Sequence, residues 1–463
     1  MSPQLRRTAL TGVLAGVQLL AVLDGLAASL ALPAIAHDLD LGAAGRAWTL
    51  NATSVALAGG LLVAGRVGDL VGRRPVFLTG CVLLAAGSVL AAAAPHAVVL
   101  FIGRAVIGLG AAVAYPSALS LTSSLFPDEP WRTRAFAASA VAGATGSLAG
   151  AVYGGVVSDL LGWRWVFWLT VPATLLLLVA AWRLLPADDS AGDRSRPLDL
   201  PGAVLGTAAV TGLVAAIIGL GTDSAPASVL LGLAAAAAAA TAGLVVWERR
   251  HPDPLLPGRV VRSRRLAGGS IGVAANSALW SVIVFVLAQE LQADGWSAAR
   301  AGVAVLPCSA GIVVAGVLIV PRLRRRLGSV WTAILGLAAS SVAVSLLALV
   351  PDDPQLVPHL LGPLALLGVG LSATSTGLTE HTVKEAPEGA EGVSAAVFES
   401  STHIGGAVSI ALYAAVLALG SFGPAYLVAA GCGAIAALGV GVLQRPRTPA
   451  QGHGHSLRLA AGG

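Results

Sequence analysis

Charge is what this sequence lacks most. Only 11% of its 463 residues are Asp, Glu, Lys or Arg, whereas soluble domains carry about 25%. Hydrophobic residues make up 56% of the chain, and the mean hydropathy is +0.83. No soluble core could bury so much apolar surface, so most of it must face lipid or other helices. The shortage of charge therefore excludes a soluble globular protein.

Cysteine and the common catalytic motifs are scarce or missing. Cys81, Cys308 and Cys432 each lie inside an apolar run without a second Cys or a His at ligand spacing, so neither a disulfide framework nor a metal site is supported. The sequence contains no GxxxxGK[ST] loop, no HExxH motif and no catalytic triad pattern. We therefore predict that the protein is not an enzyme or an ATP-driven pump, and that it has no catalytic residues, no metal site and no cofactor.

What the sequence does contain is a series of long apolar runs. A helix needs about 20 apolar residues to cross a bilayer, and fourteen runs approach or exceed this length. The first is too long for the apolar core of a signal peptide, so we interpret it as a retained helix. The predicted spans are residues 8–32, 46–65, 76–94, 97–125, 135–158, 163–184, 200–221, 226–247, 267–291, 299–320, 329–350, 357–379, 392–418 and 421–443.

The positions of the basic residues support this arrangement. Cytoplasmic loops of membrane proteins are enriched in Lys and Arg. With both termini inside, 24 of the 28 basic residues fall in cytoplasmic segments, three lie outside (Arg46, Arg164 and Arg300), and Arg104 lies within a span. The pI of about 9.6 therefore reflects membrane topology, and we expect no nucleic-acid partner.

No connector is long enough for a soluble domain, and the two longest divide the chain. We predict a six-helix bundle at 1–185, a cytoplasmic linker at 186–199, two accessory helices at 200–247, a second linker at 248–266, a six-helix bundle at 267–443 and a cytoplasmic tail at 444–463. The accessory pair has no charged residue in its interior. It is either a lateral hairpin or lipid-facing filler, and the second interpretation is favoured because polar residues mark transport paths.

Asp24 lies within the first apolar run. A charged side chain at the centre of a bilayer costs at least about 3 kcal/mol on insertion scales, so such residues usually face the bundle interior and mark ion or substrate paths. Asp24 is therefore the leading candidate for a proton-binding site.

A short motif follows the second span, with Gly65, Asp69, Gly72, Arg73 and Arg74 at fixed spacing. Glycines permit tight turns, and a carboxylate among arginines can form a charge-assisted latch. The alternative is an ordinary positive loop. The stretch resembles the helix 2–3 signature of the major facilitator superfamily, and a basic echo without the acid occurs at residues 316–328.

Residues 23–35 strengthen the resemblance. Leu23-Asp24-Gly25 and the later Pro33 resemble the first-helix signature of the fourteen-helix drug:proton antiporters, although the usual Asn after the Asp is absent. The resemblance implies an all-α membrane protein with the major facilitator fold, in which two six-helix bundles and two extra transmembrane helices give 14 spans.

Arg104 resembles the intramembrane arginine of the same family. It lies about as far below the outer surface as Asp24, roughly 10–13 Å at 1.5 Å per residue. The matched depths make a pair between the first and fourth helices possible, in which the arginine favours the charged carboxylate. The pair would either couple protons to transport or simply hold the two helices together.

The fifth span carries a glycine pattern that resembles the antiporter signature of the superfamily. Glycines at three- and four-residue spacing form a flat strip on which a facing helix can pack and slide. Ala151 stands where the family has Pro, which puts the usual kink in doubt. The residues of the strip are Gly143, Gly146, Gly150, Gly154 and Gly155.

The second half offers two further candidate sites. Glu399 and His403 are four residues apart and share one helical face, so they form a second candidate proton site or part of a hydrated vestibule. Asn276 and Trp280, one turn apart, could line a substrate cavity or pack in the core.

We predict a proton-coupled antiporter that exports hydrophobic or amphipathic drugs by alternating access in a bacterial cytoplasmic membrane. Its partners would be a small-molecule substrate, protons and the lipid bilayer, and we expect a monomer with both termini in the cytoplasm. A proton-coupled metabolite importer of the same fold is the main alternative, and a non-transporting membrane sensor is a further one.

Overall fold

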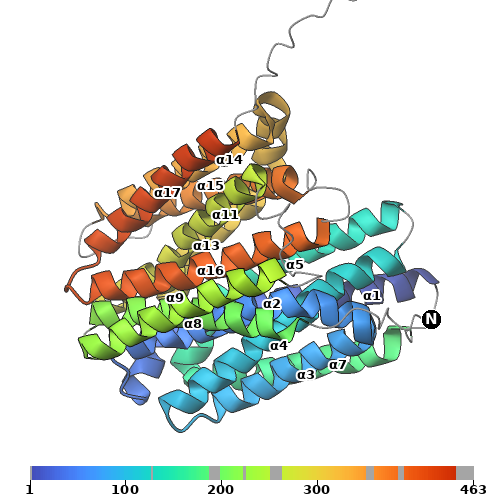
Figure 1. Cartoon of the computed structure of the whole chain (residues 1–463), viewed down its shortest axis with the longest axis horizontal. Helices are drawn as coiled ribbons and strands as arrows, with labels where there is room; N and C mark the ends of the chain where they lie inside the picture. Colours follow the sequence, from blue (N-terminus) through green and yellow to red (C-terminus); the bar gives the residue numbers. More distant parts are fainter. Residues whose placement is uncertain are drawn as a thin grey trace, which may run out of the picture.

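A computed structural model describes residues 3–126, 129–186, 199–222, 226–250, 263–350, 359–383 and 391–444, and these are almost entirely helical (Figure 1). The first group of helices packs mainly within itself, through contacts such as α1 with α5, α2 with α4 and α3 with α4. We call this group the N bundle. It comprises α1 (Pro3–Asp38), α2 (Ala43–Val71), α3 (Arg73–Ala92), α4 (Ala97–Leu125), α5 (Glu129–Leu161), α6 (Trp163–Trp168) and α7 (Thr170–Leu184).

The C bundle is held together in the same way, by contacts such as α11 with α16, α13 with α15 and α14 with α15. It comprises α11 (Arg264–Ser281), η1 (Val282–Leu287), α12 (Ala288–Ala293), α13 (Ala298–Val314), η2 (Ala315–Ile319), α14 (Val320–Leu347), α15 (Leu361–Val383), α16 (Glu391–Leu417) and α17 (Gly423–Leu443). Between the bundles in sequence lie α8 (Leu200–Thr222) and α9 (Ala227–Arg250), which pack against each other.

Eleven helices in the described part of the chain are long and apolar enough to cross a membrane. One of them, Ala298–Leu347, is 50 residues long. It covers most of two predicted spans and is interrupted at Gly328. The apolar part of α8 reaches only from Val204 to Leu220, and α2 is not among the eleven. An all-helical membrane protein is confirmed, whereas the count of fourteen spans and the domain bounds stay predictions.

Glycine makes the sharp corners between successive helices. Gly72 joins α2 to α3 with φ of 101°, and Gly162 joins α5 to α6 with φ of 91°. Gly328 has φ of 81° and interrupts α14 with a non-helical residue. Only glycine adopts such angles at little cost. Gly72 and Gly328 hold corresponding positions in the two halves. The basic segment at residues 316–328, which resembles the motif around Gly72, therefore also ends at a glycine corner.

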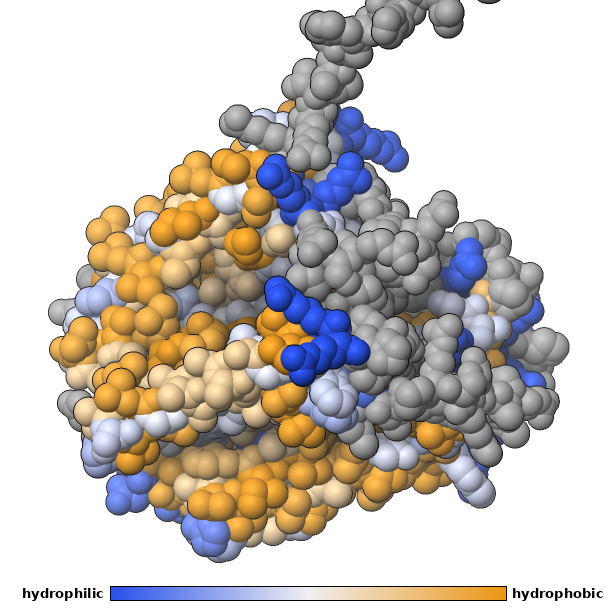
Figure 2. Space-filling model, viewed as in Figure 1, coloured by the Kyte–Doolittle hydropathy of each residue, from blue (hydrophilic) through white to orange (hydrophobic). Residues whose placement is uncertain are grey.

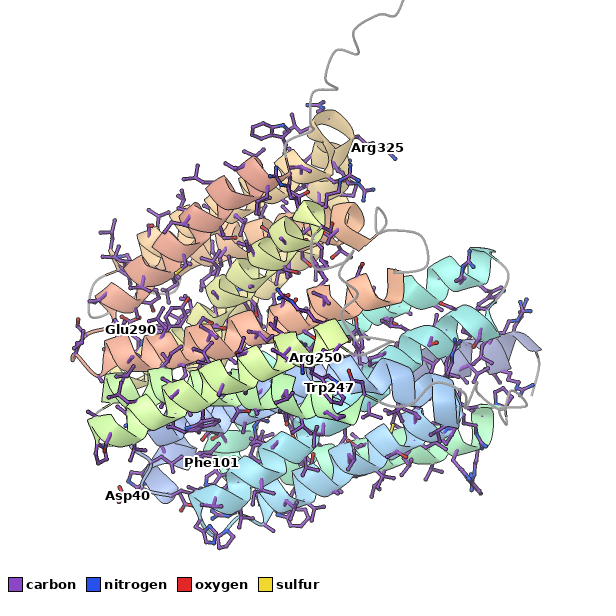
Figure 3. The ribbon with its side chains drawn as sticks, viewed as in Figure 1. Asp40, Phe101, Trp247, Arg250, Glu290 and Arg325 are labelled. Carbon is purple, nitrogen blue, oxygen red and sulfur yellow. The ribbon has the colours of Figure 1, made fainter. Side chains whose placement is uncertain are left out.

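The two ends of the helices need separate names. We call the end at which α1 begins and α17 finishes the terminal end, and the opposite end the distal end. Figure 3 shows Asp40 and Glu290 at the distal end and Arg325 at the terminal end. Hydrophobic residues cover most of the face seen in Figure 2, and the most hydrophilic ones gather toward the terminal end.

The bundles meet along two pairs of helices, α2 with α16 and α5 with α13. The helix α8 packs against both α2 and α16, and Val214 and Ile218 are almost fully buried. Interpreting both accessory helices as lipid-facing filler is therefore wrong for α8. Many residues of α9 are exposed, including Leu231, so that helix does resemble lipid-facing filler.

Candidate proton and substrate sites

Asp24 and Arg104 are in direct contact. A guanidinium nitrogen (Nη1) of Arg104 on α4 donates to Oδ2 of Asp24 on α1. The exposed fraction of the side chain is 8% for Asp24 and 2% for Arg104, so both charges are almost completely withdrawn from solvent. The matched depths inferred from the sequence therefore correspond to an ion pair between α1 and α4.

Two further groups enclose the guanidinium of Arg104. Its Nε donates to the backbone carbonyl of Thr49 on α2 at 3.0 Å, and its Cζ lies 5.8 Å from the ring centre of Phe167 on α6. Buried charges are tolerated when they are paired and hydrogen-bonded, and an arginine over an aromatic ring gains a cation–π attraction. Arg104 thus connects α1, α2, α4 and α6 around one charge.

The ion pair lies near the boundary between the bundles. Ser29, five residues after Asp24, donates from its hydroxyl to the carbonyl of Val284 in η1. Gln292 of α12 donates to the carbonyl of Leu30 at 3.2 Å. A movement of α1 that follows a change of charge at Asp24 would therefore act directly on contacts with the C bundle.

Glu399 and His403 are also brought together, but in a more open setting. His403 Nε2 lies 3.6 Å from Glu399 Oε1, and their side chains are 36% (Glu399) and 27% (His403) exposed. The helix α16 packs against α2, so Glu399 and His403 lie on a helix at the boundary with the N bundle. The contrast in exposure separates a sealed acid at Asp24 from an accessible acid at Glu399.

Asn276 and Trp280 are both half-buried on α11. Asn276 Oδ1 is buried and has no hydrogen-bond partner in the described residues. The π-helical turn η1 begins directly after Ser281, and such turns are frequent at functional sites. A distal cavity of about 240 Å³, lined by residues including Arg46 and Gln289, does not include Asn276 or Trp280. Their role in a substrate cavity stays a prediction.

The basic motif binds the ends of neighbouring helices. Arg73 Nη1 donates to the carbonyl of Ser120 near the end of α4 at 3.3 Å, and Arg74 Nη2 donates to the carbonyl of Trp182 in the last turn of α7 at 2.8 Å. Cations stabilise the carbonyl end of a helix. The predicted latch at Asp69 cannot be assessed, because Asp69 and Gly65 fall among the side chains outside the described set.

The glycine strip of α5 serves two partners, and the expectation of a single face is wrong. A Cβ at Gly146 or Gly150 would strike the backbone of α1 at Leu19 or Leu23, and Gly154 abuts Ala27 in the same way. Gly143 lies more loosely beside Gln18 of α1. Gly155 instead faces α13, where its Cβ would lie 2.7 Å from the Cα of Ala299. The strip therefore lets α5 approach α1 and the C bundle closely at once.

Sequence reasoning missed a contact at the distal end of α5. Asp159 accepts hydrogen bonds from the backbone N–H groups of Ala298 and Ala299 on α13. The signal in the sequence that could have indicated this contact is the acidic residue Asp159, a few residues after Gly155, the last glycine of the strip.

Comparison with known protein families identifies the family of this two-bundle protein. Residues 14–409 match the model of the Major Facilitator Superfamily. The chain belongs to this superfamily. Members are transporters, which agrees with the absence of catalytic motifs from the sequence.

Relatives within the superfamily have names connected with antibiotics. The chain is 35% identical to the puromycin resistance protein pur8 of Streptomyces alboniger over 86% of this chain and 80% of that protein. It is 34% identical to the lincomycin resistance protein of Streptomyces lincolnensis over 87% and 83%. The cephamycin export protein CmcT of Amycolatopsis lactamdurans is 30% identical over 87% and 84%.

Solved structures confirm the fold. A crystal structure of an auto-inhibited POT family peptide transporter superposes with a TM-score of 0.71 over 96% of this chain and 97% of that chain, at 18% identity. A second POT family transporter, in complex with a thioalcohol-conjugated peptide, gives a TM-score of 0.72 over 94% and 96%, at 14% identity. At this identity the likeness establishes the major facilitator fold alone.

Proposed function

We propose that the protein exports drug-like small molecules, antibiotics among them, in exchange for protons. The names of its relatives support export of antibiotics, since they include resistance and export proteins. The observation that carries the proposal is the buried pair of Asp24 and Arg104, because a carboxylate inside a membrane bundle is costly unless it is used.

The cycle we propose begins with Asp24 charged and bound to Arg104. In the state open to the outside, a proton neutralises Asp24 and weakens its attraction to the guanidinium, which keeps its bond to Thr49 and its contact with Phe167. Because α1 also contacts η1 and α12, the change at Asp24 biases the angle between the bundles. Export then follows from rocking of the bundles about a central site.

In the proposed mechanism, the substrate binds in the accessible region near Glu399. The Glu399 side chain is 36% exposed in a state where that of Asp24 is 8% exposed, so the two acids would meet substrate and proton at different stages. His403, 3.6 Å from Glu399, would relay protons to or from it as its close neighbour. The driving force is adequate in scale, since one elementary charge crossing 100 mV releases about 2.3 kcal/mol.

We further propose that the terminal end faces the cytoplasm, so that the distal end is the outer one, and that a monomer in the bacterial cytoplasmic membrane is the working unit. The excess of arginine in segments on the side of the termini supports this orientation. It makes the described structure outer-closed, since α1 and α5 contact the C bundle near their distal ends.

Efflux from loaded cells and from proteoliposomes tests the proposal. Puromycin, lincomycin and a cationic dye form the first panel, each measured with and without an imposed proton gradient. We expect export that stops when the gradient is collapsed. Accumulation that rises with the gradient would instead identify an importer, and the lack of any gradient-linked movement for a wide panel would contradict proton-coupled transport.

A further inference from the structure

The first turn of α13 is completed by a residue from the other bundle. An α-helix leaves its first backbone N–H groups without partners inside the helix. At α13 the N–H of Arg300 donates to Ser297 Oγ at 3.2 Å, which is the usual cap from the same chain segment. The N–H groups of Ala298 and Ala299 donate to the two carboxylate oxygens of Asp159, at 3.2 Å and 2.8 Å. The N bundle thus supplies part of the cap of a C-bundle helix.

The chemistry of this contact favours the carboxylate. A helix N-terminus carries a partial positive charge, which attracts an anion, and N–H groups that donate to a carboxylate form charge-assisted hydrogen bonds. A side chain on the same segment would make such a cap permanently. Here the acceptor lies on α5, so the cap exists only while the distal ends of α5 and α13 are together.

Close packing continues from Asp159 along the same pair of helices. Gly155, one turn before Asp159, lies against the backbone of Ala298 and Ala299. Deeper in the contact, Ser147 Oγ and Ser309 Oγ are 3.0 Å apart. The seam between α5 and α13 is therefore closed over several turns, and Asp159 holds its distal edge.

We propose that Asp159 is a gating residue of the transport cycle, whose carboxylate latches α5 to the N-terminus of α13 and must release it before the site opens at the distal end. This inference rests on the alternating-access part of the proposed function and on its orientation, and is independent of the substrate and of the proton-binding residue. Because Asp159 is exposed, water can replace its partners, which makes the latch reversible.

Accessibility of a cysteine within the seam tests the latch. Ser147 is only 6% exposed, so a Ser147→Cys reporter is sealed from the distal side until α5 and α13 separate. Cys81 and Cys308 are buried, and Cys432→Ser removes the exposed native thiol. Labelling by a membrane-impermeant maleimide is then measured without substrate or proton gradient, both in intact cells and in inverted vesicles.

We expect Asp159→Asn to raise the labelling rate from outside about tenfold, which corresponds to about 1.4 kcal/mol, and to lower the rate from inside. Asp159→Ala should act at least as strongly because it removes both acceptors. Asp38→Asn is the matched control, since Asp38 is another distal carboxylate whose hydrogen bonds, among the described residues, are to Trp163 and Arg164 of its own bundle. It should leave the labelling rates unchanged.

Three outcomes would overturn the latch. They are unchanged labelling in both Asp159 variants, an equal rise in the Asp38 control, and a fall in thermal stability without any change in labelling. Failure of the proposed function is seen separately, because the labelling assay requires no transport. The expected labelling in a protein that exports no drug would support the latch and contradict the proposed function. Unchanged labelling in a working exporter would contradict the latch alone.

Discussion

Asp24→Asn is the substitution that most directly tests the buried ion pair. The amide oxygen can still accept a hydrogen bond from Arg104, but the guanidinium loses its counter-charge while only 2% exposed. Breaking a buried pair by removing one partner costs about 3–5 kcal/mol. Arg104 keeps its hydrogen bond to the Thr49 carbonyl and its contact with the Phe167 ring. We therefore expect Asp24→Asn to lower the free energy of unfolding by an amount near the lower limit of that range.

Asp24→Asn should impair proton-driven export more than it impairs the stability of the protein. An amide cannot bind and release the coupling proton, so Asp24→Asn should still exchange substrate across proteoliposomes at equal pH but should not drive net export by a pH gradient. Substrate flux and the signal of a trapped pH-sensitive dye are measured together. Arg104→Ala should be similarly severe, because it leaves a buried carboxylate without a cation.

A double-mutant cycle separates the two possible roles of the pair. Asp24→Asn combined with Arg104→Gln should restore part of the stability lost in each single variant, since residues in contact show coupling energies of about 0.5–3 kcal/mol. Restored stability with no restored proton coupling would support the proton site. Proton-driven export at the wild-type rate in Asp24→Asn would refute the reasoning and move the coupling role to Glu399.

Three other predictions follow from the described contacts. Glu399→Gln should reduce export several-fold without loss of thermal stability, and His403→Ala should have a smaller effect, since this half-exposed pair contributes at most about 1 kcal/mol; transport rates and melting curves check both. Gly154→Leu should prevent α5 from packing on α1 at Ala27, whereas Gly143→Ala meets only the flexible Gln18 side chain, with 3.4 Å to its nearest atom; the yield of folded protein should fall sharply in the first variant alone. Hydrogen bonds from Arg164 and Trp163 lower the pKa of Asp38 below 3.8, so its contribution to stability is present above pH 3.8 and is lost as the pH falls through the lowered value. The difference in melting temperature between wild type and Asp38→Asn should therefore be small, constant from pH 7 to about pH 5, and absent well below pH 3.8.

Much of the fold could be predicted because a bilayer imposes strong constraints on a chain. Backbone groups in lipid must be paired internally, which makes every long apolar run a helix, and the depth of a residue follows from its distance along that helix. This arithmetic gave Asp24 and Arg104 matching depths and so made their contact possible, and the structure shows the contact itself. The bounds of α1, Pro3–Asp38, exceed the predicted 8–32 because the helix continues beyond the apolar run at both ends, through Pro33 and the buried Ile35 at the second.

The contacts between bundles could not be predicted in the same way. Which face of α5 meets α1 and which meets α13 depends on the crossing of whole helices, so Gly155 could not be separated from Gly154 by spacing alone. The position of α8 depends on its contacts with both α2 and α16, which come together only after both bundles have formed. The cap of α13 by Asp159 joins residues 139 and 140 positions apart, and no local pattern specifies such a pair.

The separation of Asp24 from Arg104 also affects how the chain is made. The two residues are 80 positions apart, and chains are synthesised at about 5–20 residues per second. Asp24 would therefore leave the ribosome about 4–16 seconds before its partner exists. During that interval the first helix carries an unpaired acid, which favours its retention beside the insertion machinery until the fourth helix arrives. Under the proposed function, Arg104 would then serve assembly as well as transport, and we expect its loss to slow release of the nascent N bundle into the lipid.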